Sequence, residues 1–145
     1  MKPTKTPAMK LEVKHDNDLL RSNGIYMAGT DNRIVYVDDL FDQMPVIVKR
    51  YLLLHEEGHI IAEHPHKRTL SQELEADKYA MKKLGKIITF KVLRYLIKVF
   101  MNIDWTVSAA FTVRLADLGY RKAKAMTITA PNGLTFDVNT IRRYL

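Results

Sequence analysis

Cysteine is absent from this 145-residue chain. Disulfide bonds and cysteine-based zinc fingers are therefore excluded, and any metal must be held by histidine and carboxylate side chains. A chain without cysteine also suits a reducing compartment, and we expect a cytoplasmic location.

Long uncharged apolar runs are missing as well. The opening residues, MKPTKTP, have no apolar core of the kind that a secretory signal needs. The most apolar stretch, residues 87–101, contains Lys91, Arg94 and Lys98, so it is too short and too charged to span a bilayer. We therefore expect no membrane span.

Acidic residues are outnumbered by basic ones, and the formal net charge is +7. This balance would suit nucleic acid, an anionic surface or an acidic partner, but a solvated basic surface explains it equally well. The length suits one domain, residues 1–145, with its own core. Residues 1–8, rich in lysine, proline and threonine, are predicted to form a disordered tail.

The most informative motif is His-Glu-Glu-Gly-His at residues 55–59. Two histidines four apart lie on one face of a helix, where both rings can reach one zinc ion at about 2.0–2.1 Å. Zinc lowers the pKa of a water molecule from about 15.7 to about 7, and Glu56 lies where it could take that proton. The helix, expected from Pro45 to near His64, is strongly apolar, so its buried histidines and glutamates need a compensating partner.

A catalytic zinc site needs a third protein ligand, and the sequence offers three candidate positions. The metzincin pattern would place it six residues after His59, but that residue is Pro65, and Ala62 occupies the position of the pattern's glycine. The metzincin pattern therefore fails at two positions. His64 or His66 could fold back across a turn at Pro65 and supply the ligand.

The third candidate, Glu73, lies on a second helix whose start is marked by a capping box from Thr69 to Gln72. Glu73 and Asp77 are four residues apart and share one helix face. Glu73 could bind the metal while Asp77 accepts a hydrogen bond from the far nitrogen of a ligand histidine. Glu75 projects about 200° away from Glu73 and is the weaker candidate.

The two segments, His-Glu-x-x-His and Glu-x-x-x-Asp, resemble those of the gluzincin zinc metallopeptidases. The stretch from Glu73 to Ala80 is similar to small bacterial and phage-borne peptidases of the ImmA/IrrE-like and HtpX-like groups, and the likeness covers about residues 24–85. Aspartate at position 77 fits the HtpX-like form, while asparagine is frequent there in the ImmA/IrrE-like form, so both groups stay candidates. The membrane-embedded architecture of the HtpX-like group does not fit the charged apolar stretches.

The resemblance implies a zinc metalloendopeptidase with one catalytic Zn²⁺. Its ligands would be His55, His59 and Glu73, with Glu56 as general base and Asp77 as support for a ligand histidine. The substrate would be a protein or peptide, and a transcriptional repressor would be the substrate by analogy with the ImmA/IrrE-like group. Peptide hydrolysis also needs a donor for the developing oxyanion, for which Tyr51, Tyr79, His15, His64 and His66 are all candidates.

Hydrophobic patterning predicts an α+β fold. Residues 10–15, 24–27 and 33–37 are strand-like, with a turn at 29–32, which predicts a small antiparallel N-terminal sheet packed on the pair of metal-binding helices. The resemblance implies that an edge strand beside the site holds an extended substrate, and residues 33–37 are the candidate.

Residues 86–145 are predicted to form further helices and a hairpin. Gly85 should end the second metal-site helix, Asn102 or Asp104 should cap a helix over 105–118, and Asn132-Gly133 marks the hairpin. This order resembles a winged helix. The alternative hypothesis is therefore a regulatory or DNA-binding protein with a structural or vestigial zinc site, whereas the favoured interpretation is that these helices cover the peptidase core.

Overall fold

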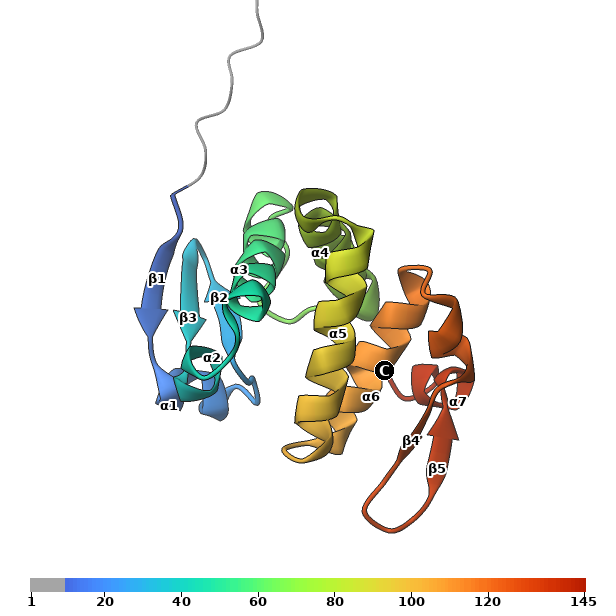
Figure 1. Cartoon of the computed structure of the whole chain (residues 1–145). Helices are drawn as coiled ribbons and strands as arrows, with labels where there is room; N and C mark the ends of the chain where they lie inside the picture. Colours follow the sequence, from blue (N-terminus) through green and yellow to red (C-terminus); the bar gives the residue numbers. More distant parts are fainter. Residues whose placement is uncertain (1–9) are drawn as a thin grey trace, which may run out of the picture.

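The computed structural model describes residues 10–145, so the predicted tail over residues 1–8 lies outside the described residues. The fold is α+β, as predicted, with a small sheet at one end, helices in the middle and a hairpin at the other end (Figure 1). The elements in chain order are β1 (Glu12–His15), α1 (Asn17–Ser22), β2 (Ala28–Asp31), β3 (Ile34–Val37), α2 (Asp39–Asp42), α3 (Val46–Ile61), α4 (Leu70–Leu84), α5 (Lys86–Met101), α6 (Trp105–Asp117), a 3₁₀ turn η1 (Arg121–Ala125), β4 (Thr127–Thr129), β5 (Thr135–Asp137) and α7 (Val138–Arg142).

The N-terminal sheet is mixed, which corrects the prediction of an antiparallel sheet. Its strand order is β1-β3-β2, and β3 pairs antiparallel with β2 but parallel with β1. Helix α1 lies at the end of the sheet between β1 and β2, and the hairpin then places β3 between these two strands (Figure 1). Because β3 is paired on both sides, residues 33–37 cannot be the substrate-holding edge; the free edge beside α3 belongs to β2.

The predicted hairpin is present, but it is shifted along the chain. The first strand is β2 rather than residues 24–27, and the turn is made by Asn32 and Arg33. Asn32 adopts a left-handed backbone conformation with φ +55°, which asparagine tolerates better than most residues. Gly29 is therefore a strand residue, and an added Cβ there would lie 3.0 Å from the side chain of Leu20.

The metal-site helices begin as predicted but one ends early. The capping box of Thr69 and Gln72 is formed at the start of α4, and Gly85 (φ +87°) ends it. Helix α3 ends at Ile61 rather than near His64. The reason is Glu63, whose φ of +55° lets the amides of residues 63 and 64 bond back to the carbonyls of Ile60 and His59.

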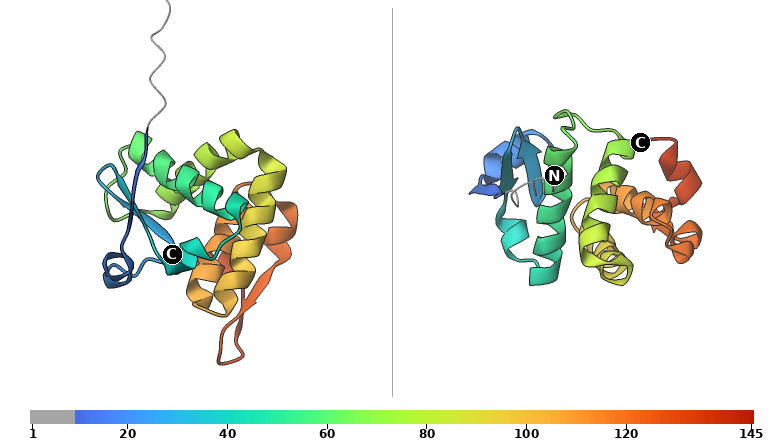
Figure 2. Two further views of the ribbon diagram at one scale, coloured as in Figure 1. Left: turned by 60° about the vertical axis from the view of Figure 1, so that its left-hand side comes forward. Right: turned by 90° about the horizontal axis from the view of Figure 1, so that it is seen from above.

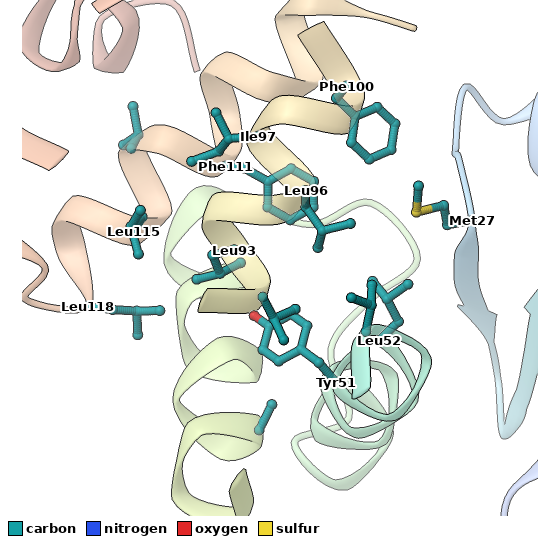
Figure 3. Packing of buried hydrophobic residues seen from close by; sticks show 14 of the residues in the cluster. Met27, Tyr51, Leu52, Leu93, Leu96, Ile97, Phe100, Phe111, Leu115 and Leu118 are labelled. Carbon is teal, nitrogen blue, oxygen red and sulfur yellow. The ribbon is translucent and has the colours of Figure 1, made fainter. Parts of the chain in front are cut away.

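The hydrophobic core lies where α3, α5 and α6 meet. Figure 3 shows Leu93 and Leu96 of α5 near Tyr51 and Leu52 of α3, and Phe100 of α5 facing Met27. Phe111 and Leu115 of α6 lie on the other side of these α5 residues. Seen from above in Figure 2, the sheet lies on one side of α3, and α4 and α5 lie on the other. None of the helices over residues 10–145 combines the length and apolarity needed to cross a membrane.

Helix α6 lies deep in this core. Its only exposed residue is Thr106, and the run from Phe111 to Ala116 is buried throughout. A DNA-recognition helix must present a polar face to the groove. The position of α6 therefore favours the interpretation that the C-terminal helices complete the core.

Candidate metal centre

The structure brings three predicted ligands together at the interface of α3 and α4. The Nε2 atoms of His55 and His59 lie 3.0 Å apart, and Oε1 of Glu73 lies 2.7 Å from His59 Nε2 and 3.7 Å from His55 Nε2. Two donors on a tetrahedral zinc ion are about 3.3 Å apart when each bond is about 2.0–2.1 Å. The three distances lie on both sides of that value, so this donor set fits a zinc ion.

Gly58 allows the two helices to approach this closely. A Cβ at Gly58 would lie 3.1 Å from Cβ of Tyr79 and 3.2 Å from Cα of Ala76, both on α4. Such contacts are closer than ordinary packing allows, and the backbone atom cannot move aside easily. The glycine within the His-Glu-Glu-Gly-His motif thus sets the spacing between the ligands on α3 and Glu73 on α4.

Behind His55, a buried carboxylate holds the ring. Nδ1 of His55 lies 2.8 Å from Oδ1 of Asp77, which is fully buried. Asp77 also accepts a hydrogen bond from the Tyr51 hydroxyl and two from Arg114, whose Nε and Nη2 lie 2.7 and 2.6 Å from the carboxylate. The His55 ring therefore has its Nδ1 proton directed at Asp77 and its Nε2 directed at the other ligands.

Arg114 is a site residue that the sequence interpretation missed. It reaches the site from α6, pairs with Asp77, and also lies 3.5 Å from Oε2 of Glu73. A signal was present in the sequence, because Arg114 is the only basic residue in a predominantly apolar predicted helix. A buried guanidinium requires a carboxylate partner, although the sequence does not say which one.

The alternative ligands His64 and His66 do not join the donor set. His64 contacts His59, but through the two Nδ1 atoms, which lie 2.8 Å apart on the side of the His59 ring away from Glu73. His66 lies 3.4 Å from the side chain of Asn23 instead. The structure therefore corrects the alternative in which either residue supplies the third ligand, because neither faces the convergence point.

Glu56 is buried beside the ligands without joining them. The Thr30 hydroxyl, on β2, donates a hydrogen bond of 2.9 Å to Oε2 of Glu56. Burial raises the pKa of Glu56 above its ordinary value. This carboxyl is therefore held in place and is a stronger base than an exposed glutamate.

Ionisation states at the centre differ strongly between neighbours. Burial opposes charge on His55, but the adjacent Asp77 carboxylate outweighs it and raises the pKa of His55 to about 9. Burial lowers the pKa of His59 to about 4. Burial also disfavours charge on Glu73, yet its contacts with the Nε2 atoms of His55 and His59 hold its pKa far below the usual range. The centre therefore holds a carboxylate, a neutral ring and a ring that keeps an extra proton near pH 7.

Two hollows open beside this centre. One, of about 520 Å³, is lined by residues that include His59, Thr30 and Arg68, and the other, of about 480 Å³, by residues that include Glu56, Glu73 and Arg68. Arg68 is thus common to both, and its Nε is buried without an acceptor among residues 10–145. Its Nη2 lies 3.4 Å from the backbone carbonyl of Thr30, at the free edge of β2.

Three of the predicted oxyanion donors, Tyr51, Tyr79 and His15, are engaged away from these hollows. Tyr51 is buried against Asp77, and the Tyr79 hydroxyl donates to Glu57 at 3.0 Å. His15 pairs with Asp39 and Asp42 at the sheet, in an exposed group away from the ligands. Of the five candidates, His64 and His66 are the two that line either hollow described above.

Comparisons with known proteins give no neighbour for this arrangement: no family model matches the chain, and neither curated proteins nor solved structures yield a match.

Replacing Arg114 by alanine should lower the free energy of unfolding by about 3–5 kcal/mol, because it leaves the Asp77 carboxylate buried without its charge partner. Urea denaturation followed by circular dichroism measures the change. The matched control is Arg142→Ala, which breaks the bidentate pair with Asp117 at the surface and should cost about 0–1 kcal/mol. Equal losses in the two variants would contradict the importance of the buried pair.

Proposed function

We propose that this protein is a zinc-dependent metallopeptidase of the gluzincin type, with His55, His59 and Glu73 as the metal ligands and Glu56 as the general base. The observation that carries the proposal is the convergence of three Lewis-basic atoms at 2.7–3.7 Å from one another, each oriented by a partner behind it. When bound there, Zn²⁺ would polarise the substrate carbonyl and acidify a water molecule.

A cation stabilises this arrangement, because a carboxylate oxygen and ring lone pairs directed at one point repel one another when neither a proton nor a metal ion lies between them. Asp77 accepts a hydrogen bond from Nδ1–H of His55, so a neutral His55 ring directs its Nε2 lone pair at the other ligands. The Glu73 carboxylate remains ionised and directs an oxygen to the same point. In the metal-free chain the extra proton on His55 relieves part of this repulsion, and a metal ion would replace that proton.

The arrangement fits a catalytic centre better than a structural one. Structural zinc sites are usually closed by four protein ligands, whereas here residues 10–145 supply three within reach of one another. A hollow lined by Glu56 and Glu73 adjoins the site. A fourth position can therefore be taken by water or by a substrate oxygen.

Glu56 is placed to move the proton in peptide hydrolysis. Water supplies the oxygen that bonds to the carbonyl carbon, Glu56 accepts the proton released, and the same proton passes to the nitrogen as the C–N bond breaks. Thr30 restrains the carboxyl during both transfers through its 2.9 Å hydrogen bond. The raised pKa of Glu56 suits a group that must first accept a proton and then release it.

An extended peptide is the substrate shape that the surroundings favour. The free edge of β2 can pair with a substrate main chain, which does not depend on the substrate's side chains. Arg68 contacts this edge at the Thr30 carbonyl and lines the same hollow as Glu56, and its Nε lacks an acceptor among the described residues, so it is the donor that we assign to a substrate carbonyl. A specific protein, with a repressor as the substrate by analogy, and a cytoplasmic setting are part of the same proposal.

Purified protein should contain about one zinc ion per chain, and His59→Ala and Glu73→Ala should lose it while keeping their fold. Plasma emission spectrometry gives the metal content, and circular dichroism checks the fold. His66→Ala is the control, since His66 stands apart from the ligands and should retain full zinc. Full zinc in folded Glu73→Ala would overturn the ligand assignment.

Zinc binding should release about one proton at pH 7, because His55 has a pKa of about 9 in the metal-free protein while His59, at about 4, is already neutral. The apparent affinity should then rise about tenfold per pH unit above pH 7 and level off once the pH passes the His55 pKa. Calorimetric titration in buffers of different ionisation enthalpy counts the released protons. Binding without proton release would contradict the protonated state of His55.

Glu56→Gln should keep stoichiometric zinc and lower peptide hydrolysis by about 10²–10⁴-fold, since the amide cannot accept the proton. Cleavage of an unfolded protein mixture, analysed by mass spectrometry, provides the rate. Glu57→Gln is the matched control on the same helix, because Glu57 accepts from Tyr79 and is not among the ligands. Unchanged hydrolysis in Glu56→Gln would exclude Glu56 as the base.

A further inference from the structure

His64 lies directly behind the second ligand histidine. Its Nδ1 is 2.8 Å from Nδ1 of His59, and its Nε2 is 3.1 Å from Oε2 of Glu75. Its side chain is only 6% exposed, whereas that of Glu75 is 63% exposed. A chain of side-chain contacts therefore runs from a solvent-facing carboxylate on α4, through His64, to the ring of His59.

The end of α3 is built in a way that puts His64 there. Glu63 adopts φ +55°, a left-handed conformation that non-glycine residues rarely adopt. The amide of His64 bonds to the carbonyl of His59 at 3.0 Å, which closes the helix end. The reversal of the chain at Glu63 thus returns His64 to the helix turn that carries His59.

The hydrogen-bond roles in this chain are set by its ends. The Glu75 carboxylate can only accept, so Nε2 of His64 carries the proton and donates. A neutral His64 then has a lone pair on Nδ1, which accepts from Nδ1–H of His59. The opposite assignment would turn the Nε2 lone pair of His64 toward a carboxylate. This leaves Nε2 of His59, which lies 2.7 Å from Oε1 of Glu73, to present its lone pair to a metal ion bound beside Glu73 and His55.

We propose that His64 and Glu75 form a positioning relay for His59, as the counterpart of Asp77 for His55. The relay fixes the ring orientation and the tautomer that leave Nε2 free to bind a metal. It rests on the proposed function in naming that metal as zinc. On the His55 side the Asp77 carboxylate contacts the ligand ring directly. On the His59 side His64 lies between the ligand ring and the Glu75 carboxylate, so the charge of Glu75 stays at the surface.

Removing a partner of this kind typically weakens metal affinity by about 10–100-fold. His64→Ala should therefore weaken zinc binding by about 10–100-fold, and Glu75→Ala by roughly threefold to tenfold, because His64 remains. His64→Gln should stay within about threefold of wild type, since its amide can accept from His59 and donate to Glu75. His66→Ala, a nearby histidine outside the relay, should bind as wild type.

Competition against a chromophoric zinc chelator measures these affinities, and thermal melting checks each fold. Wild-type affinity in folded His64→Ala, or a His64→Gln variant as weak as His64→Ala, would overturn the relay. If His64→Ala fails to fold, the zinc affinity of Glu75→Ala, a change at an exposed position, tests the relay in its place. Wild-type zinc affinity in Glu75→Ala would also contradict the relay.

A second readout needs no metal. Nitrogen-15 NMR of metal-free wild type should show scalar coupling across the hydrogen bond that joins Nδ1 of His59 and Nδ1 of His64, and its absence would overturn the relay. A wild type that binds no zinc would overturn the proposed function alone, while this coupling would still decide whether His64 holds His59.

Discussion

The buried pair of Asp77 and Arg114 is the interaction on which the rest of the site depends. Asp77 holds the His55 ring and accepts from Tyr51, so one carboxylate joins α3 to α4, and Arg114 ties both to α6. Two charges out of water are costly, and the geometry compensates only because Asp77 is saturated with donors. Replacing a buried ion pair by apolar residues of similar volume is often neutral for stability, so we assign this pair to orienting the site residues.

The pair of Asp77 and Arg114 also connects the C-terminal part of the chain to the site. Helix α6 supplies both Arg114 and core residues such as Phe111 and Leu115, which pack with α5 (Figure 3). Residues 86–145 therefore complete the site and the core together. A winged helix needs an exposed recognition helix. In this structure α6 is mostly buried, because its Arg114 pairs with Asp77 and its apolar residues pack against α5.

The site combines a close approach of α3 and α4 with hydrogen-bonding partners at the far nitrogen of each ligand histidine. Gly58 lets α4 come near enough to α3 for Glu73 to reach two histidines, and Asp77 and His64 each hold one of those rings by its far nitrogen. Glu56 is held by Thr30 from the sheet side. The converging atoms and Glu56 are thus held by residues from the sheet, from both site helices and from the turn between them, and this arrangement is the basis of the proposed metal site.

Local signals in the sequence determined much of this protein. The spacing of His55 and His59, the capping box at Thr69, the stop at Gly85 and the cap at Asp104 each act within a few residues, and the structure has each element where those signals predict it. The placement of Glu73 and Asp77 on one helix face followed from helix periodicity alone. Tertiary structure decided what lies far apart in sequence: the central position of β3, the pairing of Arg114 with Asp77, and the place of Arg68 beside Glu56. Even His64, only five residues from His59, depended on the left-handed turn at Glu63, which no residue preference predicts. Periodicity and capping are properties of short segments, whereas the choice of a charge partner or a sheet neighbour depends on how whole elements pack.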